Sequence, residues 1–233
     1  MPTRMSKTKN KKQKTRTMEQ QTFIAAVQRQ ADWIDALEKA AFSLHDRVNQ
    51  TYDHYLPYGF HLKQTASYVS RYGHWVADRP SDIWTLYAAA YLHDTLEDTR
   101  MSYHDLERFL HDFLRENEPL PANDLPEIER QVPEIVYALT NEKGRTRSQR
   151  ADERYYRGIR EVRFASFIKM CDRLANMSYS VLFLFTNRMF AVYKQEYPAF
   201  IRSIDEGSVT PIPEAMKKDA EEILSRETYP ERL

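Results

Sequence analysis

The chain has 233 residues, equal numbers of basic (34 Lys and Arg) and acidic (34 Asp and Glu) residues, and only five glycines. This length suits one sizeable core and is short for two domains, and no apolar run is long enough for a transmembrane helix or a signal peptide. The single cysteine, Cys171, excludes an intrachain disulfide, so the composition favours a cytoplasmic protein over a secreted or membrane protein.

The first 17 residues contain seven Lys and Arg and no acidic residue, which leaves a net charge of −7 on residues 18–233. No apolar face accompanies these basic charges, so we predict a disordered basic tail over residues 1–17. We favour a non-functional extension over a nucleic-acid contact for this tail. Residues 18–233 then form one predicted domain.

Helical periodicity accounts for the start of this domain. Apolar residues recur near every 3.6 positions over residues 18–47, which predicts one amphipathic helix. A loop is expected at 52–60 and a second helix at 61–77. A turn follows at 79–82, where Ser81 or Asp82 is placed to cap the next helix.

Further helices are predicted at 102–116, from Pro133 to about 140, at 149–157 with a break at Gly158, and at 164–179, 181–205 and 213–226. Ser102 and Asp105 are spaced to form a capping box at the first of these helices. No segment alternates polar and apolar residues as a strand would. The predicted class is therefore all-α, with a single helical domain.

The segment 88–99 is the most informative part of the chain. It places His93 and Asp94 one helical turn before Glu97 and Asp98, so on a helix the four side chains crowd one face. The preceding residues are small and apolar, which indicates a buried helix. Because desolvating three carboxylates and an imidazole is costly, this arrangement indicates a bound cation.

Two distant segments could complete the same site. His61 begins a predicted helix, and Asp172 lies one turn before Asn176 in an otherwise apolar helix. Together with His93 and Asp94 they give two imidazoles and two carboxylates, a set that suits Mn, Fe, Co, Ni or Zn better than Ca²⁺. The structural alternatives are a helix cap for His61 and an ion pair with Arg173 for Asp172.

Three motifs are similar, in this order, to those of a known family: Pro-Tyr-Gly-Phe-His at 57–61, Leu-His-Asp-Thr-Leu-Glu-Asp-Thr at 92–99, and Ile-Lys-Met-Cys-Asp-Arg-Leu-Ala-Asn-Met at 168–177. They resemble the HD-domain phosphohydrolases, over roughly residues 40–185. Within that family the chain looks most like the hydrolase module of the Rel/Spo alarmone enzymes and their small stand-alone relatives. Those enzymes remove pyrophosphate from guanosine tetraphosphate (ppGpp), the alarmone of the stringent response.

The resemblance implies a helical HD-domain fold with a metal site between helices, a divalent cofactor that is usually Mn²⁺, and a small-molecule nucleotide substrate. Attack at the phosphorus on the ribose 3′ oxygen would release pyrophosphate. Asn176 would contact the nucleotide near its sugar or phosphates. Carried over position by position, the implied metal ligands are His61, His93, Asp94 and Asp172, and the implied catalytic residues are Glu97 and Asp98.

Substrate contacts are less well specified by the motifs. Relatives specific for guanosine usually carry an Arg-Lys pair about nine residues before the first histidine ligand, where Tyr52 and Asp53 stand here. Tyr52 could stack on a base instead, since every base has a π face. Lys143 and Arg145 lie in a cationic turn that would suit several phosphates, with an ordinary solvated loop as the alternative.

Two other functions stay open on this scaffold: an HD-type hydrolase of another nucleotide, and a non-catalytic nucleotide-binding protein. The intact Glu97-Asp98 pair favours an enzyme, because a binding protein would not need it. The His-Asp pairs at 104–105 and 111–112 lie in polar segments typical of solvated surface. The sequence does not specify the oligomeric state, and a homo-oligomer is compatible with it.

Overall fold

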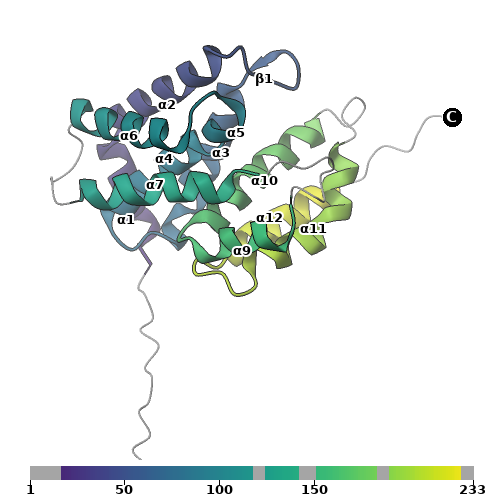
Figure 1. Cartoon of the computed structure of the whole chain (residues 1–233). Helices are drawn as coiled ribbons and strands as arrows, with labels where there is room; N and C mark the ends of the chain where they lie inside the picture. The colour runs from purple at the N-terminus through teal and green to yellow at the C-terminus, as the bar shows by residue number, and fades with distance from the viewer. Residues whose placement is uncertain (1–16, 118–123, 142–150, 183–188, 227–233) are drawn as a thin grey trace, which may run out of the picture.

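The computed structural model describes residues 17–117, 124–141, 151–182 and 189–226, and within these ranges the chain is almost entirely helical, which confirms the predicted all-α class (Figure 1). The N-terminal helices are α1 (Gln20–Arg29), α2 (Ala31–Asp46), α3 (Gly59–Tyr72), α4 (Pro80–Leu92), α5 (Thr95–Asp98) and α6 (Tyr103–Asn117), with a 3₁₀ turn η1 (Gly73–Trp75). The later helices are α7 (Leu125–Leu139), α9 (Glu153–Glu161), α10 (Ala165–Leu182), α11 (Met189–Asp205) and α12 (Glu214–Ser225). No helix in these ranges is both long and apolar enough to cross a membrane.

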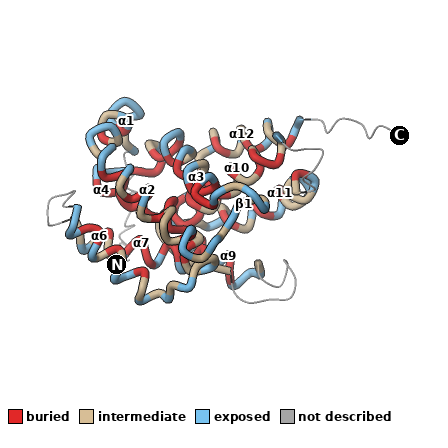
Figure 2. The backbone as a smooth tube through the Cα atoms, turned by 90° about the horizontal axis from the view of Figure 1, so that it is seen from above, coloured by how far each residue is buried: buried red, intermediate tan, exposed pale blue. Residues whose placement is uncertain are grey.

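The helices α4 and α10 form the centre of the fold. Every residue of α4 after Pro80 is buried, which explains why its sequence is apolar on all sides and not on one face. It packs against α1, α2, α3, α7 and α10. The helix α10 packs in turn against α3 and α7 on one side of the molecule and α9, α11 and α12 on the other (Figure 1). Figure 2 shows the buried stretches of α3 and α10 together in the middle of the molecule.

The segment predicted as one helix over residues 18–47 forms two helices, so that prediction was wrong at its middle. The break is at Gln30, whose φ of −109° and ψ of 11° interrupt the helical path. This bend lets both α1 and α2 pack against α4. Amphipathic periodicity continues across the break, which is why the sequence did not reveal it.

The predicted loop at 52–60 contains a short antiparallel hairpin of β1 (Thr51–Tyr52) and β2 (Leu56–Pro57). Its turn residues Asp53 and His54 adopt positive φ values of 48° and 69°. Asp and His enter this left-handed region more readily than most residues, so the turn closes without glycine. Two-residue strands are too short to show an alternating pattern.

Two helix boundaries in the second half also differ from the prediction. The helix α7 begins well before Pro133, because Pro126 occupies its first turn, where a missing N–H has no cost. Pro133 lies inside the helix. The helix α9 contains Gly158 and begins after Asp152, whose side chain accepts a backbone N–H at 3.0 Å. The predicted helix at 181–205 lies partly outside the described residues, at 183–188.

Capping hydrogen bonds are present, as predicted, at the starts of α6 and α4. At α6, Asp105 accepts the backbone N–H of Ser102 at 2.9 Å and donates its own N–H to Ser102 Oγ at 3.3 Å. At α4, the buried carboxylate of Asp82 accepts two backbone N–H groups, at 2.8 and 3.2 Å. Arg163, two residues before the start of α10, places Nη1 at 2.8 Å from Asp82 Oδ1. Asp82 therefore ties the start of α4 to the start of α10.

Asp82→Ala should lower the free energy of unfolding by about 2–3 kcal/mol, because it removes a buried cap and leaves the Arg163 guanidinium without this partner. Urea unfolding followed by circular dichroism would measure the change. Glu107→Ala, which removes a carboxylate from the exposed face of α6, is the matched control and should change the midpoint much less. Equal midpoints for the two variants would contradict the assigned role of Asp82.

Candidate metal centre

Close packing between α2 and α3 fixes the position of His61. Gly59, two residues earlier, faces the ring of Phe42 so closely that a Cβ at position 59 would lie 2.6 Å from it. Only glycine permits this approach without a shift of the ring or the helix. His61 itself is buried, with 2% of its surface exposed. The contact between Gly59 and Phe42 therefore determines where the imidazole enters the site.

The helix that carries His93 ends at this residue. His93 follows the last residue of α4, and Asp94 (φ −97°, ψ 2°) interrupts the helix before the single turn α5. The four residues expected on one helical face thus lie on two short segments, and the prediction of a continuous helix was wrong here. His93 Nδ1 donates to the carbonyl oxygen of Ala90 at 2.9 Å. This hydrogen bond occupies Nδ1, so Nε2 is the ring nitrogen that could bind an ion.

The structure brings together the side chains of His61, His93, Asp94 and Asp172 from three distant segments. His61 Nε2 lies 3.3 Å from His93 Nε2 and 3.3 Å from Asp172 Oδ1. His93 Nε2 lies 2.8 Å from Asp94 Oδ2. Neighbouring ligands at about 2.1 Å from one ion are roughly 3 Å apart. His61, His93 and Asp172 form a group whose ligating atoms all lie within 4.8 Å of one another, which is compatible with a single cation. Asp94 is not part of this group but contacts both of its histidines.

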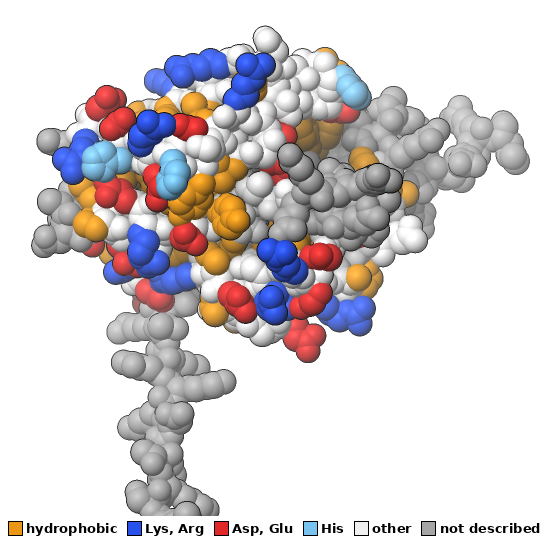
Figure 3. Space-filling model, viewed as in Figure 1, with side chains coloured by type: hydrophobic (Ala, Val, Ile, Leu, Met, Phe, Trp, Pro, Cys, Tyr) orange, Lys and Arg blue, Asp and Glu red, His pale blue; other side chains and the backbone are white. Residues whose placement is uncertain are grey.

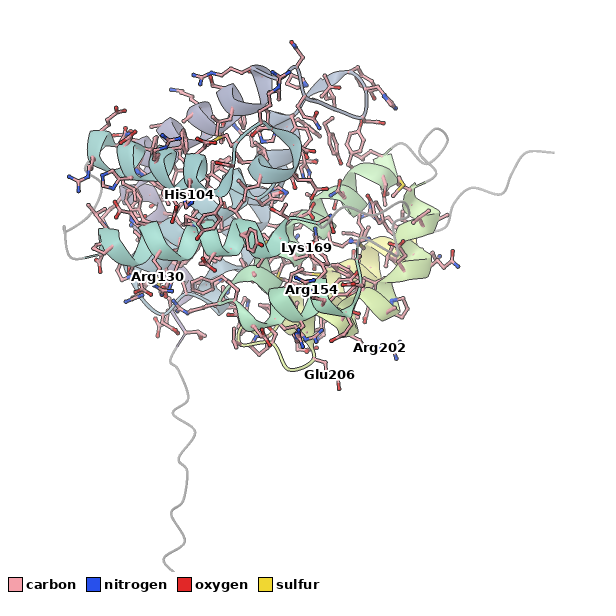
Figure 4. All side chains as sticks on the ribbon, viewed as in Figure 1. His104, Arg130, Arg154, Lys169, Arg202 and Glu206 are labelled. Carbon is pink, nitrogen blue, oxygen red and sulfur yellow. The ribbon has the colours of Figure 1, made fainter. Side chains whose placement is uncertain are left out.

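Two residues of α10 hold the carboxylate of Asp172. Lys169 Nζ donates to Oδ2 at 3.0 Å, and Asn176 Nδ2 donates to Oδ1 at 2.5 Å. Burial disfavours the charged carboxylate, but Lys169 and the two histidines hold the pKa of Asp172 well below its ordinary value. Figure 4 shows Lys169 in the interior, where α10 passes α7 and α9. Lys169 therefore forms a structural ion pair, and its partner is a proposed metal ligand.

Tyr58, for which the sequence alone predicts no role, contacts the site. Its hydroxyl donates to Asp94 Oδ2 at 2.6 Å. Its ring stacks on the buried imidazole of His45, with centroids 4.5 Å apart and planes 13° apart. Burial lowers the pKa of His45 to about 4, so this imidazole is neutral. The one sequence signal for Tyr58 is its place beside Pro57 in the first motif.

Tyr52 covers one side of His61. The two rings are parallel within 9°, with centroids 5.1 Å apart, and the Tyr52 hydroxyl donates to Asn176 Oδ1 at 2.9 Å. One face of Tyr52 is thus already in contact with His61. A nucleobase could stack only on the opposite face.

Glu97 and Asp98 face a cavity of about 500 Å³ that His61, Asp94 and Asp172 also line, whereas His93 does not. Asn141 donates both its backbone N–H and its side-chain amide to Glu97 Oε2, each at 3.2 Å. Burial and the nearby charge of Asp94 raise the pKa of Asp98 to about 6. A carboxyl group that titrates near neutrality suits proton exchange with a substrate. Most of the site residues predicted from the sequence lie in the cavity wall: Tyr52, His61, Asp94, Glu97, Asp98, Asp172 and Asn176.

The remaining candidates lie elsewhere. Lys143 and Arg145 are outside the described residues. His104 and His111 lie on the surface as expected, with side chains 86% and 45% exposed. Figure 4 labels His104 on α6, and Figure 3, in the same view, shows His side chains on the surface among Lys, Arg, Asp and Glu. These histidines therefore do not contribute to the buried centre.

Comparison with solved structures finds a likeness in fold. No family model matches the chain, and no curated protein matches it. A solved structure described as a metazoan ortholog of SpoT that hydrolyzes ppGpp and plays a role in starvation responses superposes with a TM-score of 0.54. The two share 17% sequence identity over 82% of this chain and 93% of the other. At this identity the likeness shows a shared helical fold and no more.

Ion binding to this centre should weaken as the pH falls. Burial acts to lower the pKa of His61, but its contacts with Asp172 and Asp94 raise that pKa to about 9 in the ion-free protein. A metal ligand must be deprotonated, so below about pH 9 an ion has to displace this proton, and the apparent Mn²⁺ affinity should drop about tenfold per pH unit. Titration calorimetry in buffers of different ionisation enthalpy would count the proton released. An affinity independent of pH between about 8 and 6 would contradict this assignment.

Proposed function

We propose that this protein is a metal-dependent phosphohydrolase that releases pyrophosphate from the ribose 3′ position of ppGpp or a closely related nucleotide. The main support is the convergence of His61, His93, Asp94 and Asp172 beside the acidic pair Glu97-Asp98. The similarity in fold to a protein described as hydrolysing ppGpp agrees with this proposal. The proposed cofactor is a divalent ion such as Mn²⁺, and the proposed setting is a starvation response in the cytoplasm.

The ion would be held by the two imidazole Nε2 atoms and by the carboxylates of Asp94 and Asp172. When bound, it supplies Lewis-acid activation of water and of a phosphate group. Lys169 and Tyr58 keep the two carboxylates in place through hydrogen bonds of 3.0 and 2.6 Å. Because the two carboxylates are already held in position, they would have to move little when an ion binds.

Proton transfer is assigned to the acidic pair. Glu97, positioned by two hydrogen bonds from Asn141, would take the proton from the attacking water as general base. Asp98, whose pKa is raised to about 6 by burial and by Asp94, would return a proton to the departing 3′ oxygen. The different surroundings of the two carboxylates thus assign them different roles.

Nucleotide contacts are proposed for Asn176 and Tyr52, which both lie in the cavity wall. Lys143 and Arg145 are proposed as phosphate contacts because of their positive charge in the sequence after α7. The Tyr52-Asp53 replacement of the family's Arg-Lys pair is the observation that favours the second candidate function, hydrolysis of a different nucleotide.

Purified protein with Mn²⁺ should release pyrophosphate, and no orthophosphate, from ppGpp. A panel of nucleotides assayed for both products tests this directly. Orthophosphate release from nucleoside monophosphates, with no activity on 3′-pyrophosphorylated nucleotides, would replace the proposal with the second candidate. Nucleotide binding without any turnover would indicate a non-catalytic protein.

A further inference from the structure

Arg173 occupies the side of the cavity that faces α11 and plays no part in the proposed metal centre. Its side chain is only 11% exposed and lines the cavity. The guanidinium carbon lies 4.1 Å from the ring centroid of Phe200 and 4.8 Å from that of Tyr193. Contact with two aromatic rings fixes the guanidinium plane and excludes water from its faces.

The hydrogen-bonding capacity of this arginine is mostly unused by the residues that the structure describes. A guanidinium has five N–H donors. Its ion pair within these ranges is a single contact from Nη1 to Glu196 Oε2, at 3.4 Å. A partly buried, oriented guanidinium at a cavity wall, most of whose donors have no partner among the described residues, is suited to bind a phosphate or carboxylate.

The position of Arg173 on α10 places it beside the reaction site. Lys169, Asp172, Arg173 and Asn176 fall within about 100° of one another around the helix axis, and all four line the cavity. Lys169 is already engaged with Asp172. Of the two cations on this stripe, Arg173 is therefore the one available to a ligand.

We propose that Arg173 is a specificity-determining residue that binds a second anionic group of the substrate, a phosphate remote from the phosphate that is cleaved. This inference rests on the proposed function and narrows it, since it requires a nucleotide with phosphate at two positions. In ppGpp the second group is the 5′-diphosphate. Its oxygens would accept hydrogen bonds from the free guanidinium donors, with Glu196, Tyr193 and Phe200 holding the plane.

Arg173→Gln should raise KM for ppGpp by about 10- to 100-fold, the range for loss of charge-assisted hydrogen bonds. Guanosine 3′-diphosphate lacks the 5′ phosphates, and its KM should be the same for the variant and the wild type. A purely structural effect would change KM for both substrates. Arg202→Gln is the matched control, because it removes the same charge from an exposed position on α11 that does not line the cavity (Figure 4).

Binding without turnover provides a second readout. In the presence of a chelator, calorimetry should show that the wild type prefers guanosine 5′-diphosphate to guanosine and that Arg173→Gln loses this preference. Absence of hydrolysis by the wild type would refute the proposed function and leave this binding test decisive for Arg173. Unchanged KM for ppGpp together with an unchanged preference for guanosine 5′-diphosphate would overturn the inference.

Discussion

Asp172→Ala should abolish stoichiometric ion binding and lower turnover at least about 1,000-fold, the loss expected when several kcal/mol of Lewis-acid stabilisation disappear. The substitution removes one of the four converging donors. It also leaves the Lys169 ammonium, now without its carboxylate at 3.0 Å, next to the two histidines that are proposed to bind a cation. Metal content by mass spectrometry, Mn²⁺ titration and pyrophosphate release would each report the loss.

A second variant separates ion binding from folding. Asp172→Asn keeps the shape of the side chain and an oxygen that can accept from Lys169, but removes the negative charge. It should keep the helical circular dichroism of the wild type and still bind Mn²⁺ at least about 100-fold more weakly. Wild-type Mn²⁺ affinity in both variants would exclude Asp172 from the metal centre.

Glu97→Gln should retain the ion and lose about 10²- to 10⁴-fold in turnover, the usual contribution of a general base. Glutamine preserves the size of the side chain and an oxygen for the hydrogen bonds from Asn141, so the wall of the cavity should keep its shape. What it removes is the ability to accept a proton. The expected signature is therefore normal Mn²⁺ affinity with reduced kcat.

The control for this variant is Asn141→Ala, which withdraws an amide hydrogen bond from Glu97 and leaves the carboxylate. It should reduce kcat much less than Glu97→Gln does, because the base is still present. Normal turnover by Glu97→Gln would show that another group accepts the proton, and loss of the ion would show that Glu97 has a structural role at the metal centre.

The sequence was sufficient to predict the class of the fold and which distant segments meet. A buried imidazole or carboxylate is stable only with a partner, so the polar residues within apolar helices, such as Asp172 in α10, indicate where segments converge. The all-round apolar sequence of α4 indicated its central position in the same way. Both inferences depend only on which side chains are polar or apolar, and this can be read from the sequence without knowing the conformation.

Local conformation and hydrogen-bond partners could not be predicted as well. The sequence before Pro133 does not predict the first two turns of α7. Ile128 and Val132 are fully buried there and stabilise the helix through tertiary packing. The helix break at Asp94 separates residues that periodicity alone would keep on one helix. The hydrogen bond from Tyr58 to Asp94 joins segments whose distance depends on the packing of α3 against α4, and no short motif encodes that distance.

The missing methyl group at position 59 has an evolutionary consequence. Because a Cβ there would overlap the ring of Phe42, drift at this position is constrained by a neighbour on another helix. Among related sequences, alanine or serine at 59 should occur together with a smaller side chain at 42, because that exchange makes room for the Cβ and leaves the imidazole of His61 in place. Covariation between positions 42 and 59 would thus show that this packing distance is maintained.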